Sequence, residues 1–221
     1  MDVITCSAQE MIFLASSLGA DTLLGVDDPF VGWLTEEIEK VWEQTQTALA
    51  RRNFIEIQPD GGIVMDVAVA ALVGACAFPD ASFVVTFTPA SGEPMTRYLH
   101  VARELVVEQA PVPGSDAYQL TALANGEAAY RRILKVLGLN EQWAVSASGG
   151  ELIEAGFIRA REKAAQAGRG EVQKVLREVG LTEDSAAALA ETLVEPVANG
   201  ALVALSRHEI AWDVAGLGLL E

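Results

Sequence analysis

The sequence predicts an α+β protein of two pseudo-symmetric lobes, each with helices followed by an antiparallel sheet. The first observation is a repeated pattern. Residues 37–42 read Glu-Ile-Glu-Lys-Val-Trp and residues 171–176 read Glu-Val-Gln-Lys-Val-Leu, and each is followed by Ala-Ala-Leu, a proline and an apolar pair. The second is a set of short apolar-rich segments between residues 82 and 123, separated by Gly and Pro turns, which is typical of a β-meander. We therefore expect a first α+β lobe over 1–139, a linker over 140–150 and a second, shorter α+β lobe over 151–221.

The first lobe begins with two helices and a hairpin. Ser7 and Glu10 have the spacing of a capping box, and the helix that they start ends at Gly19. Thr35 is expected to cap the second helix, which packs through a stripe that includes Trp42. Two short strands follow, at 53–58 and 63–65, around the turn Pro59-Asp60-Gly61-Gly62. A helix followed by a short hairpin is a winged-helix-like pattern.

The remaining elements of the first lobe are an apolar helix, the meander and one more helix. The apolar helix covers 66–78. The meander is expected to have one face in water, because polar and apolar residues alternate around Tyr98 and His100. The last helix covers 127–137 and ends at Gly138. The meander strands are predicted at 82–88, 96–101, 104–109 and 117–123.

The second lobe is predicted to hold three helices, at 151–166, 171–179 and 183–195, and then two or three strands within 200–220. Thr182 is expected to cap the third helix, and Gly180 to end the second. This lobe has no counterpart of the hairpin and a shorter sheet. Two explanations stay open: the lobes have diverged, or the second lobe is truncated.

The charge balance favours some partners over others. The net charge is −16, and residues 1–50 hold nine carboxylates against Lys40 alone, a net of −8. Such a surface repels nucleic acid and anionic membranes, whereas a basic or neutral protein partner is compatible with it. The alternative is that the acidity only keeps the protein in solution. A homo-oligomer is also compatible with the sequence.

The composition predicts a folded cytoplasmic protein. Apolar residues make up 51% of the chain. The longest apolar run, Val67–Phe78, is too short to cross a bilayer, so no membrane insertion is expected. The N-terminus lacks the basic segment of a signal peptide. Cys6 and Cys76 alone do not form a disulfide framework, which fits a reducing compartment.

No catalytic, cofactor-binding or metal site is predicted. The sequence has no glycine-rich nucleotide loop between a strand and a helix, and Ser148 lies in the predicted linker. His100 and His208 are expected to be solvated or interfacial strand residues, without the spacing of metal ligands. Cys76 is expected in the core. We therefore expect a protein that is not an enzyme.

Aromatic residues outside the predicted helices are the candidates for partner binding, because Trp and Tyr are enriched in interface hot spots. The alternative is that they are buried anchors. The candidates are Phe30, Trp33, Tyr98 and Trp212.

The order of elements resembles the EspG family of ESX (type VII) secretion-associated proteins. The residues that carry the resemblance are Leu18-Gly19, the segment Ala48–Ile55, the turn Asp60–Ile63, the helix end Cys76–Asp80 with the meander after it, and Gly200–Leu205. The resemblance implies a pseudo-two-fold α+β fold with antiparallel sheets and helical bundles. It also implies a cytosolic chaperone for PE–PPE pairs, and it carries over no catalytic residue. The second lobe is shorter than is typical of the family.

The predicted function is that of a non-enzymatic cytosolic protein-binding or chaperone-like protein, EspG-like and linked to type VII secretion. Two alternatives stay open. One is a winged-helix-like regulatory or interaction module, and the other is a small-molecule-binding protein with a site between the lobes.

Overall fold

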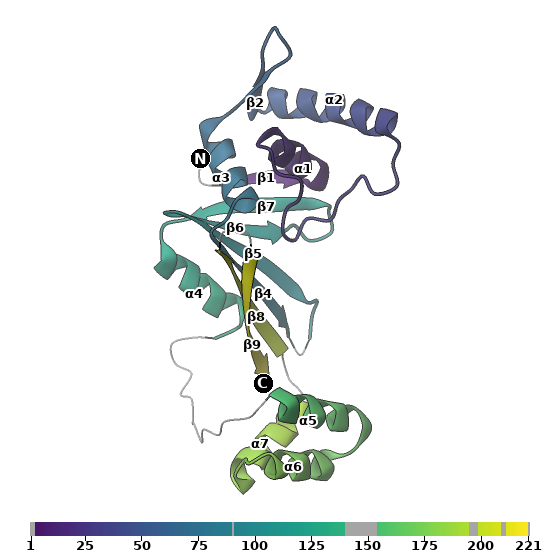
Figure 1. The fold of residues 1–221 in the computed structure, drawn as a ribbon, viewed down its shortest axis with the longest axis vertical. Helices are drawn as coiled ribbons and strands as arrows, with labels where there is room; N and C mark the ends of the chain where they lie inside the picture. Colours follow the sequence, from purple (N-terminus) through teal and green to yellow (C-terminus); the bar gives the residue numbers. More distant parts are fainter. Residues whose placement is uncertain (1–2, 90, 140–153, 195–198, 209–210, 221) are drawn as a thin grey trace. The chain divides into compact units, whose positions relative to one another are not determined.

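The computed structural model describes residues 3–89, 91–139, 154–194, 199–208 and 211–220 (Figure 1). The predicted linker at 140–150 lies outside the described residues. The chain divides into two compact units. One consists of Met1–Val85, Thr96–Val136 and Leu202–Gly216, and the other of Thr86–Met95, Leu137–Ala201 and Leu217–Glu221.

A seven-stranded sheet is the main feature, with strand order β1-β7-β6-β5-β4-β8-β9. The pairs β1–β7, β5–β6 and β6–β7 are antiparallel. The strands are β1 (Val3–Ser7), β4 (Ala81–Thr88), β5 (Met95–Ala102), β6 (Leu105–Pro111), β7 (Ala117–Leu123), β8 (Asn199–His208) and β9 (Ala211–Leu220).

The α+β class and the meander are confirmed, but the arrangement of the last strands differs from the prediction. β8 lies next to β4, so the strands predicted for the second lobe extend the sheet of the first and do not form their own. The pseudo-symmetry of two lobes stays a prediction. β1 was not predicted, and it runs directly into the capping box of the first helix.

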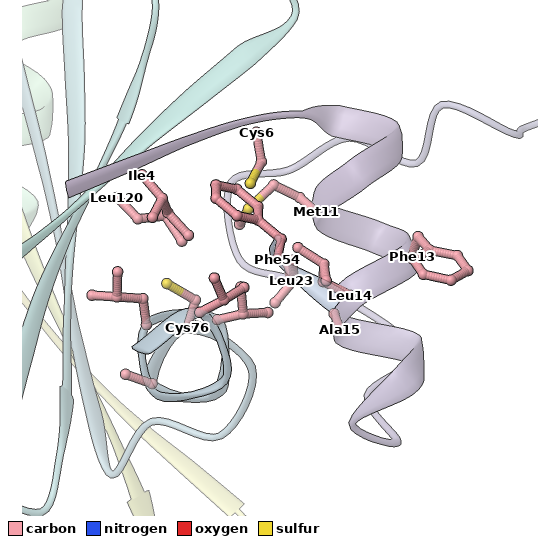
Figure 2. Close-up of a cluster of buried hydrophobic side chains, with 14 of the residues drawn as sticks. Ile4, Cys6, Met11, Phe13, Leu14, Ala15, Leu23, Phe54, Cys76 and Leu120 are labelled. Atoms are coloured by element: carbon pink, nitrogen blue, oxygen red, sulfur yellow. The ribbon is translucent and has the colours of Figure 1, made fainter. Parts of the chain in front are cut away.

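One face of the sheet carries the main apolar core. Helices α1 (Ala8–Ser17) and α3 (Val67–Ala77) contact the sheet on this face. Figure 2 shows Ile4 and Leu120 of the strands together with Met11 of α1 and Cys76 of α3. The predicted capping box is present, since Ser7 Oγ accepts from Glu10 N at 3.1 Å and Glu10 Oε2 accepts from Ser7 N at 3.0 Å.

Helix α2 (Thr35–Arg51) lies against α1. Thr45 and Leu49 are buried, and the ring of Trp42 meets Phe13 edge-on at 5.5 Å, so the predicted stripe is confirmed. The predicted cap at Thr35 is wrong. The helix starts one residue earlier, with Leu34 as N-cap, and Glu37 Oε2 accepts from Leu34 N at 2.9 Å.

The opposite face of the sheet is covered by α4 (Gly126–Val136) through Ala129 and Ile133. Arg132 of this helix binds the carboxylate of Glu108, with Nε and one terminal nitrogen each 2.7 Å from Oε2. Glu108 is only 3% exposed. On this face α4 therefore covers the meander, and an ion pair neutralises its buried carboxylate. The face of Tyr98 and His100, which was expected to be in water, is the other one, and that expectation is wrong at His100, which is fully buried.

The predicted hairpin is confirmed as a separate two-stranded sheet of β2 (Ile55–Ile57) and β3 (Ile63–Met65). Its turn is formed as expected: Asp60 Oδ1 accepts from Gly62 N at 2.9 Å, and Gly61 has φ +85°. Figure 1 shows the hairpin projecting beyond the end of α2.

Three helices form a small bundle: α5 (Glu154–Gln166), α6 (Arg169–Glu178) and α7 (Glu183–Val194). All three were predicted. Thr182 caps α7 through Ser185 N, and Gly180 ends α6 with φ +102°. The buried core of this bundle consists of Ala160, Val172, Val175, Leu176, Ala186 and Ala190.

Candidate functional site

The candidate site is the loop between α1 and α2, residues 19–34, which we call the 19–34 loop. It has no helix or strand, yet several of its side chains reach the core. A long loop held in place by buried anchors is a common location for binding residues. The buried anchors are Ala20, Leu23, Val26 and Phe30.

A chain of aromatic rings fixes the second half of this loop. The ring centroid of Phe30 lies 5.8 Å from that of Trp33 and 6.5 Å from that of Trp42, in edge-to-face arrangements. Trp42 in turn contacts Phe13 of α1. Such ring pairs stabilise by about 0.5–1.5 kcal/mol beyond their buried area. Trp33 is therefore the outermost ring of a chain that begins in the core.

The end of the loop exposes three apolar side chains. Val31 is 79%, Trp33 41% and Leu34 68% exposed. We call these three residues the apolar segment. The exposed carboxylates around it in the sequence are Asp27, Asp28, Glu36, Glu37 and Glu39. An exposed apolar centre with charged residues around it is the composition of a protein-binding surface, and its charge favours a basic partner.

Tyr98 holds the first half of the loop. Its ring is half-buried and stacks on the imidazole of His100, with centroids 6.5 Å apart. The backbone of Gly25 approaches it so closely that an added Cβ would lie 2.2 Å from the Tyr98 Cζ. Gly25 also has φ +75°, so glycine is required here for two reasons. Burial raises the pKa of the Tyr98 hydroxyl, and the charge of Asp27 raises it further.

A buried polar relay lies beneath the same loop. Ser82 Oγ is 2.9 Å from His100 Nδ1, the Gln109 side chain lies next to His100, and Gln109 Nε2 donates to Leu24 O at 3.0 Å. Burial lowers the pKa of His100 to about 4, and the Gln109 contact offsets part of this shift. His100 is therefore neutral at neutral pH.

The expectation of a solvated or interfacial His100 is wrong, since its side chain is fully buried. The relay ties the loop to the sheet through the hydrogen bond from Gln109 to Leu24 O. A cavity of about 340 Å³ reaches the relay, and Ser82 is its only lining residue from the relay. None of its lining residues is a carboxylate: Thr22, Leu23, Leu24, Cys76, Ala77, Pro79, Ser82 and Leu205.

The structure brings three of the four predicted residues to this loop. Phe30 and Trp33 belong to it, and Tyr98 packs against it from β5. Trp212 lies on β9, but the structure does not describe its side chain or that of His208. The relay was not predicted, because Ser82, His100 and Gln109 lie on three different strands and have no common sequence spacing.

The thiols do not form a reactive site. Cys6 and Cys76 are free and buried, so the prediction for Cys76 is confirmed. Burial raises the pKa of Cys6 to about 12 and raises that of Cys76 further. Within the described ranges, no three side chains of His, Cys, Asp or Glu are grouped as metal ligands. No helix in the described part of the chain is long and apolar enough to cross a bilayer.

The chain is similar to a known protein in structure but not in sequence. By sequence, neither a protein-family model nor a curated protein matches the chain. A solved structure from Mycobacterium tuberculosis does match: the type VII secretion system chaperone EspG5 in complex with the PE25–PPE41 dimer. The TM-score is 0.70 at 14% sequence identity, over 99% of this chain and 83% of that one.

The fold is that of EspG5. The expected resemblance to EspG proteins is therefore confirmed for the fold. The match extends over almost the whole chain, so the segments that form the sheet, the hairpin and the three-helix bundle all fall within it. The match leaves part of EspG5 without a counterpart in this chain.

Proposed function

We propose that the protein is a non-enzymatic, cytosolic chaperone of the EspG type that binds a PE–PPE pair for type VII secretion. The observation that carries this proposal is the match in fold to EspG5, whose structure is a complex with the PE25–PPE41 dimer. The absence of a catalytic motif from the sequence is consistent with it.

We further propose that the apolar segment takes part in binding the partner. Trp33 is the main candidate for direct contact, because it is the exposed end of the aromatic chain and Trp is the residue most enriched in hot spots. Phe30 and Tyr98 orient the loop from beneath. Trp212 is retained as a candidate from the sequence alone.

The proposed partner class can be tested by co-expression with a panel of PE–PPE pairs that includes PE25–PPE41, followed by size-exclusion chromatography with light scattering. We expect a stoichiometric complex with at least one pair. If no pair in the panel co-elutes while EspG5 binds PE25–PPE41 under the same conditions, the proposed partner class is wrong. Light scattering of the free chain also reports any homo-oligomer.

The surface can be tested separately by calorimetry with two matched variants. Trp33→Ala removes the exposed ring of the apolar segment, and Tyr130→Ala removes a ring that is more exposed (60% against 41%) on α4, which contacts β6 and β7. We expect Trp33→Ala to weaken binding by about 2 kcal/mol, as for a hot-spot residue, and Tyr130→Ala to change it little. Equal affinities for the two variants would show that the apolar segment is not part of the interface. They would not contradict the proposed partner class.

The winged-helix-like alternative is supported only by the order of α2 and the hairpin. The hairpin carries exposed carboxylates at Glu56, Asp60 and Asp66, which repel a nucleic-acid backbone. A hairpin of this charge is suited to a protein partner.

A further inference from the structure

The β2–β3 hairpin has a free strand edge with unpaired backbone groups. It is a two-stranded sheet, and no other strand of the described chain joins it. In an antiparallel pair, residues alternate between positions that bond across the pair and positions that point outward. Gln58 N donates to Gly62 O and Asp66 N donates to Phe54 O, so these pairs and Glu56–Val64 bond inward. The N–H and C=O of Ile55 and Ile57 therefore point to the outer edge of β2, and those of Ile63 and Met65 to that of β3.

The two edges differ in accessibility. Ile63 and Met65 of β3 and Ile55 of β2 pack in or against the apolar core, whereas Ile57 of β2 is 46% exposed. A groove of about 620 Å³ lies at the hairpin and is lined by residues of both strands and of the end of α2: Ala50, Asn53, Ile55, Glu56, Ile57, Val64, Met65 and Asp66. At Ile57 the edge of β2 is therefore an exposed strand edge beside a groove, which is the arrangement that strand-adding partners use.

Charge indicates what kind of strand would fit. Glu56 and Asp66 line the groove, and Asp60 lies at the turn. The nearby Arg52 is already paired with Glu10 at 2.9 Å. If a second copy of the chain added its own β2 edge in antiparallel register, Glu56 would approach its counterpart, and like charges opposite one another destabilise a sheet. A basic strand from a different protein would instead be attracted.

We propose that the hairpin binds an extended, basic and apolar segment of a partner protein by adding it as a strand to the edge of β2. Backbone groups of Ile57 hydrogen-bond to the segment, an apolar side chain occupies the groove, and Lys or Arg lies beside Glu56. This site does not depend on the PE–PPE assignment or on the apolar segment of the 19–34 loop.

The test uses the full chain and a labelled peptide of seven residues with alternating Lys and Val, measured by fluorescence anisotropy. One variant separates backbone pairing from charge. Ile57→Pro removes an outward N–H and leaves the inward bonds of the hairpin in place, since proline is tolerated at an edge strand. Its matched control is Ile57→Val, which keeps the N–H and a branched apolar side chain. We expect affinity at least about tenfold weaker for Ile57→Pro and little changed for Ile57→Val, because main-chain hydrogen bonds carry strand addition.

Two further arms complete the test. A peptide of the same sequence with every amide nitrogen methylated is expected to bind the wild type as weakly as the normal peptide binds Ile57→Pro. Glu56→Lys is expected to weaken binding more than Glu127→Lys, which makes the same charge change on exposed residues of α4. Equal binding of the methylated peptide, or equal binding to Ile57→Pro, would show that only charge attracts the peptide and would overturn the proposal. No binding of the peptide, or a dimer of the chain that Ile57→Pro dissociates, would also overturn it.

The fold of each variant can be checked without the peptide. Backbone amide exchange of Glu56 and Val64 reports the inward bonds of the hairpin. These amides are expected to exchange at similar rates in the wild type, Ile57→Pro and Ile57→Val. If Ile57→Pro accelerates their exchange, the variant has disturbed the hairpin. The methylated peptide then decides between backbone pairing and attraction by charge alone, because it is measured on the wild-type chain.

Discussion

The hydroxyl of Ser82 lies 2.9 Å from Nδ1 of His100, and both side chains are buried beneath the 19–34 loop. In the neutral imidazole one ring nitrogen accepts and the other donates. Gln109 lies next to His100, and its amide nitrogen donates to Leu24 O. Burial favours the uncharged imidazole, which can accept a hydrogen bond from Ser82.

This arrangement predicts a pH-dependent stability. Burial lowers the pKa of His100 from 6.5 to about 4 in the folded protein, and the unfolded chain keeps the ordinary value. Between these values the unfolded state binds more protons, so the free energy of unfolding falls as the pH falls from 6.5 to about 4. The loss attributable to His100 is about 3 kcal/mol.

The measurement is urea unfolding at several pH values for the wild type and His100→Gln, which keeps a polar side chain and does not titrate. Carboxylates titrate in both proteins, so the difference between the two curves isolates the imidazole. We expect the curves to converge as the pH falls. Parallel curves would show that His100 does not carry the pH dependence.

A second prediction concerns the buried carboxylate of Glu108. Arg132→Ala leaves it with Arg97 alone, at 3.7 Å, and we expect a loss of about 2–3 kcal/mol in the free energy of unfolding. Arg131→Ala is the matched control on the same helix. Arg131 pairs with Glu127 at the surface, and its loss is expected to cost less than about 0.5 kcal/mol. Similar losses in the two variants would contradict the assigned importance of the buried pair.

A third prediction separates backbone strain from close contact at the 19–34 loop. Gly25 and Gly32 both have positive φ, but an added Cβ meets the Tyr98 ring only at Gly25 and meets nothing within 4 Å at Gly32. Gly32→Ala is expected to cost about 1–2 kcal/mol from the conformation alone. Gly25→Ala is expected to cost roughly 1–3 kcal/mol more, because the ring must move.

The double variant Gly25→Ala with Tyr98→Ala tests the cause. Removal of the ring removes the steric conflict, so the cost of Gly25→Ala in that background should fall to that of Gly32→Ala. A cost that does not change in the absence of the ring would mean that the contact is not the source of the effect.

A fourth prediction distinguishes the two tryptophans near the loop. Trp42 is half-buried between Phe13 and Phe30, and Trp42→Ala is expected to lower the free energy of unfolding by about 3 kcal/mol, at the lower end of the range for core Trp→Ala substitutions. Trp33→Ala is expected to cost less than about 1 kcal/mol, since most surface substitutions have small effects. Chemical denaturation of both variants checks the order, and the reverse order would place Trp33 in the core.

The helices and turns could be predicted from the sequence because their signals are local. Ser7 and Glu10 bond to each other's backbone within one turn, and Gly138 and Gly180 adopt positive φ where their helices end. β1 could not be predicted in this way. It is an edge strand of five residues whose pairing partner, β7, is distant in the sequence.

The candidate site could also be predicted only where its signals are local in the sequence. Phe30 and Trp33 could be selected because they are close together in one loop. The expectation that His100 is solvated was wrong. The alternation of polar and apolar residues along β5 shows which side chains share a face, but it does not show which other part of the chain covers that face. Tyr98 and His100 look like a wet face in sequence, but a loop from elsewhere in the chain lies over them, with Gly25 against the Tyr98 ring and Leu24 bonded to Gln109.

The strand order has a consequence for synthesis on the ribosome. β4 ends at Thr88, but its neighbour β8 begins only at Asn199, and Arg207 N donates to Asp80 O near the start of β4. Until that segment has been made, β4 is the outermost strand of a nascent meander with its hydrogen-bonding groups open to other chains. A nascent or C-terminally shortened chain is therefore exposed to mispairing at β4, and completion of the last two strands closes that edge.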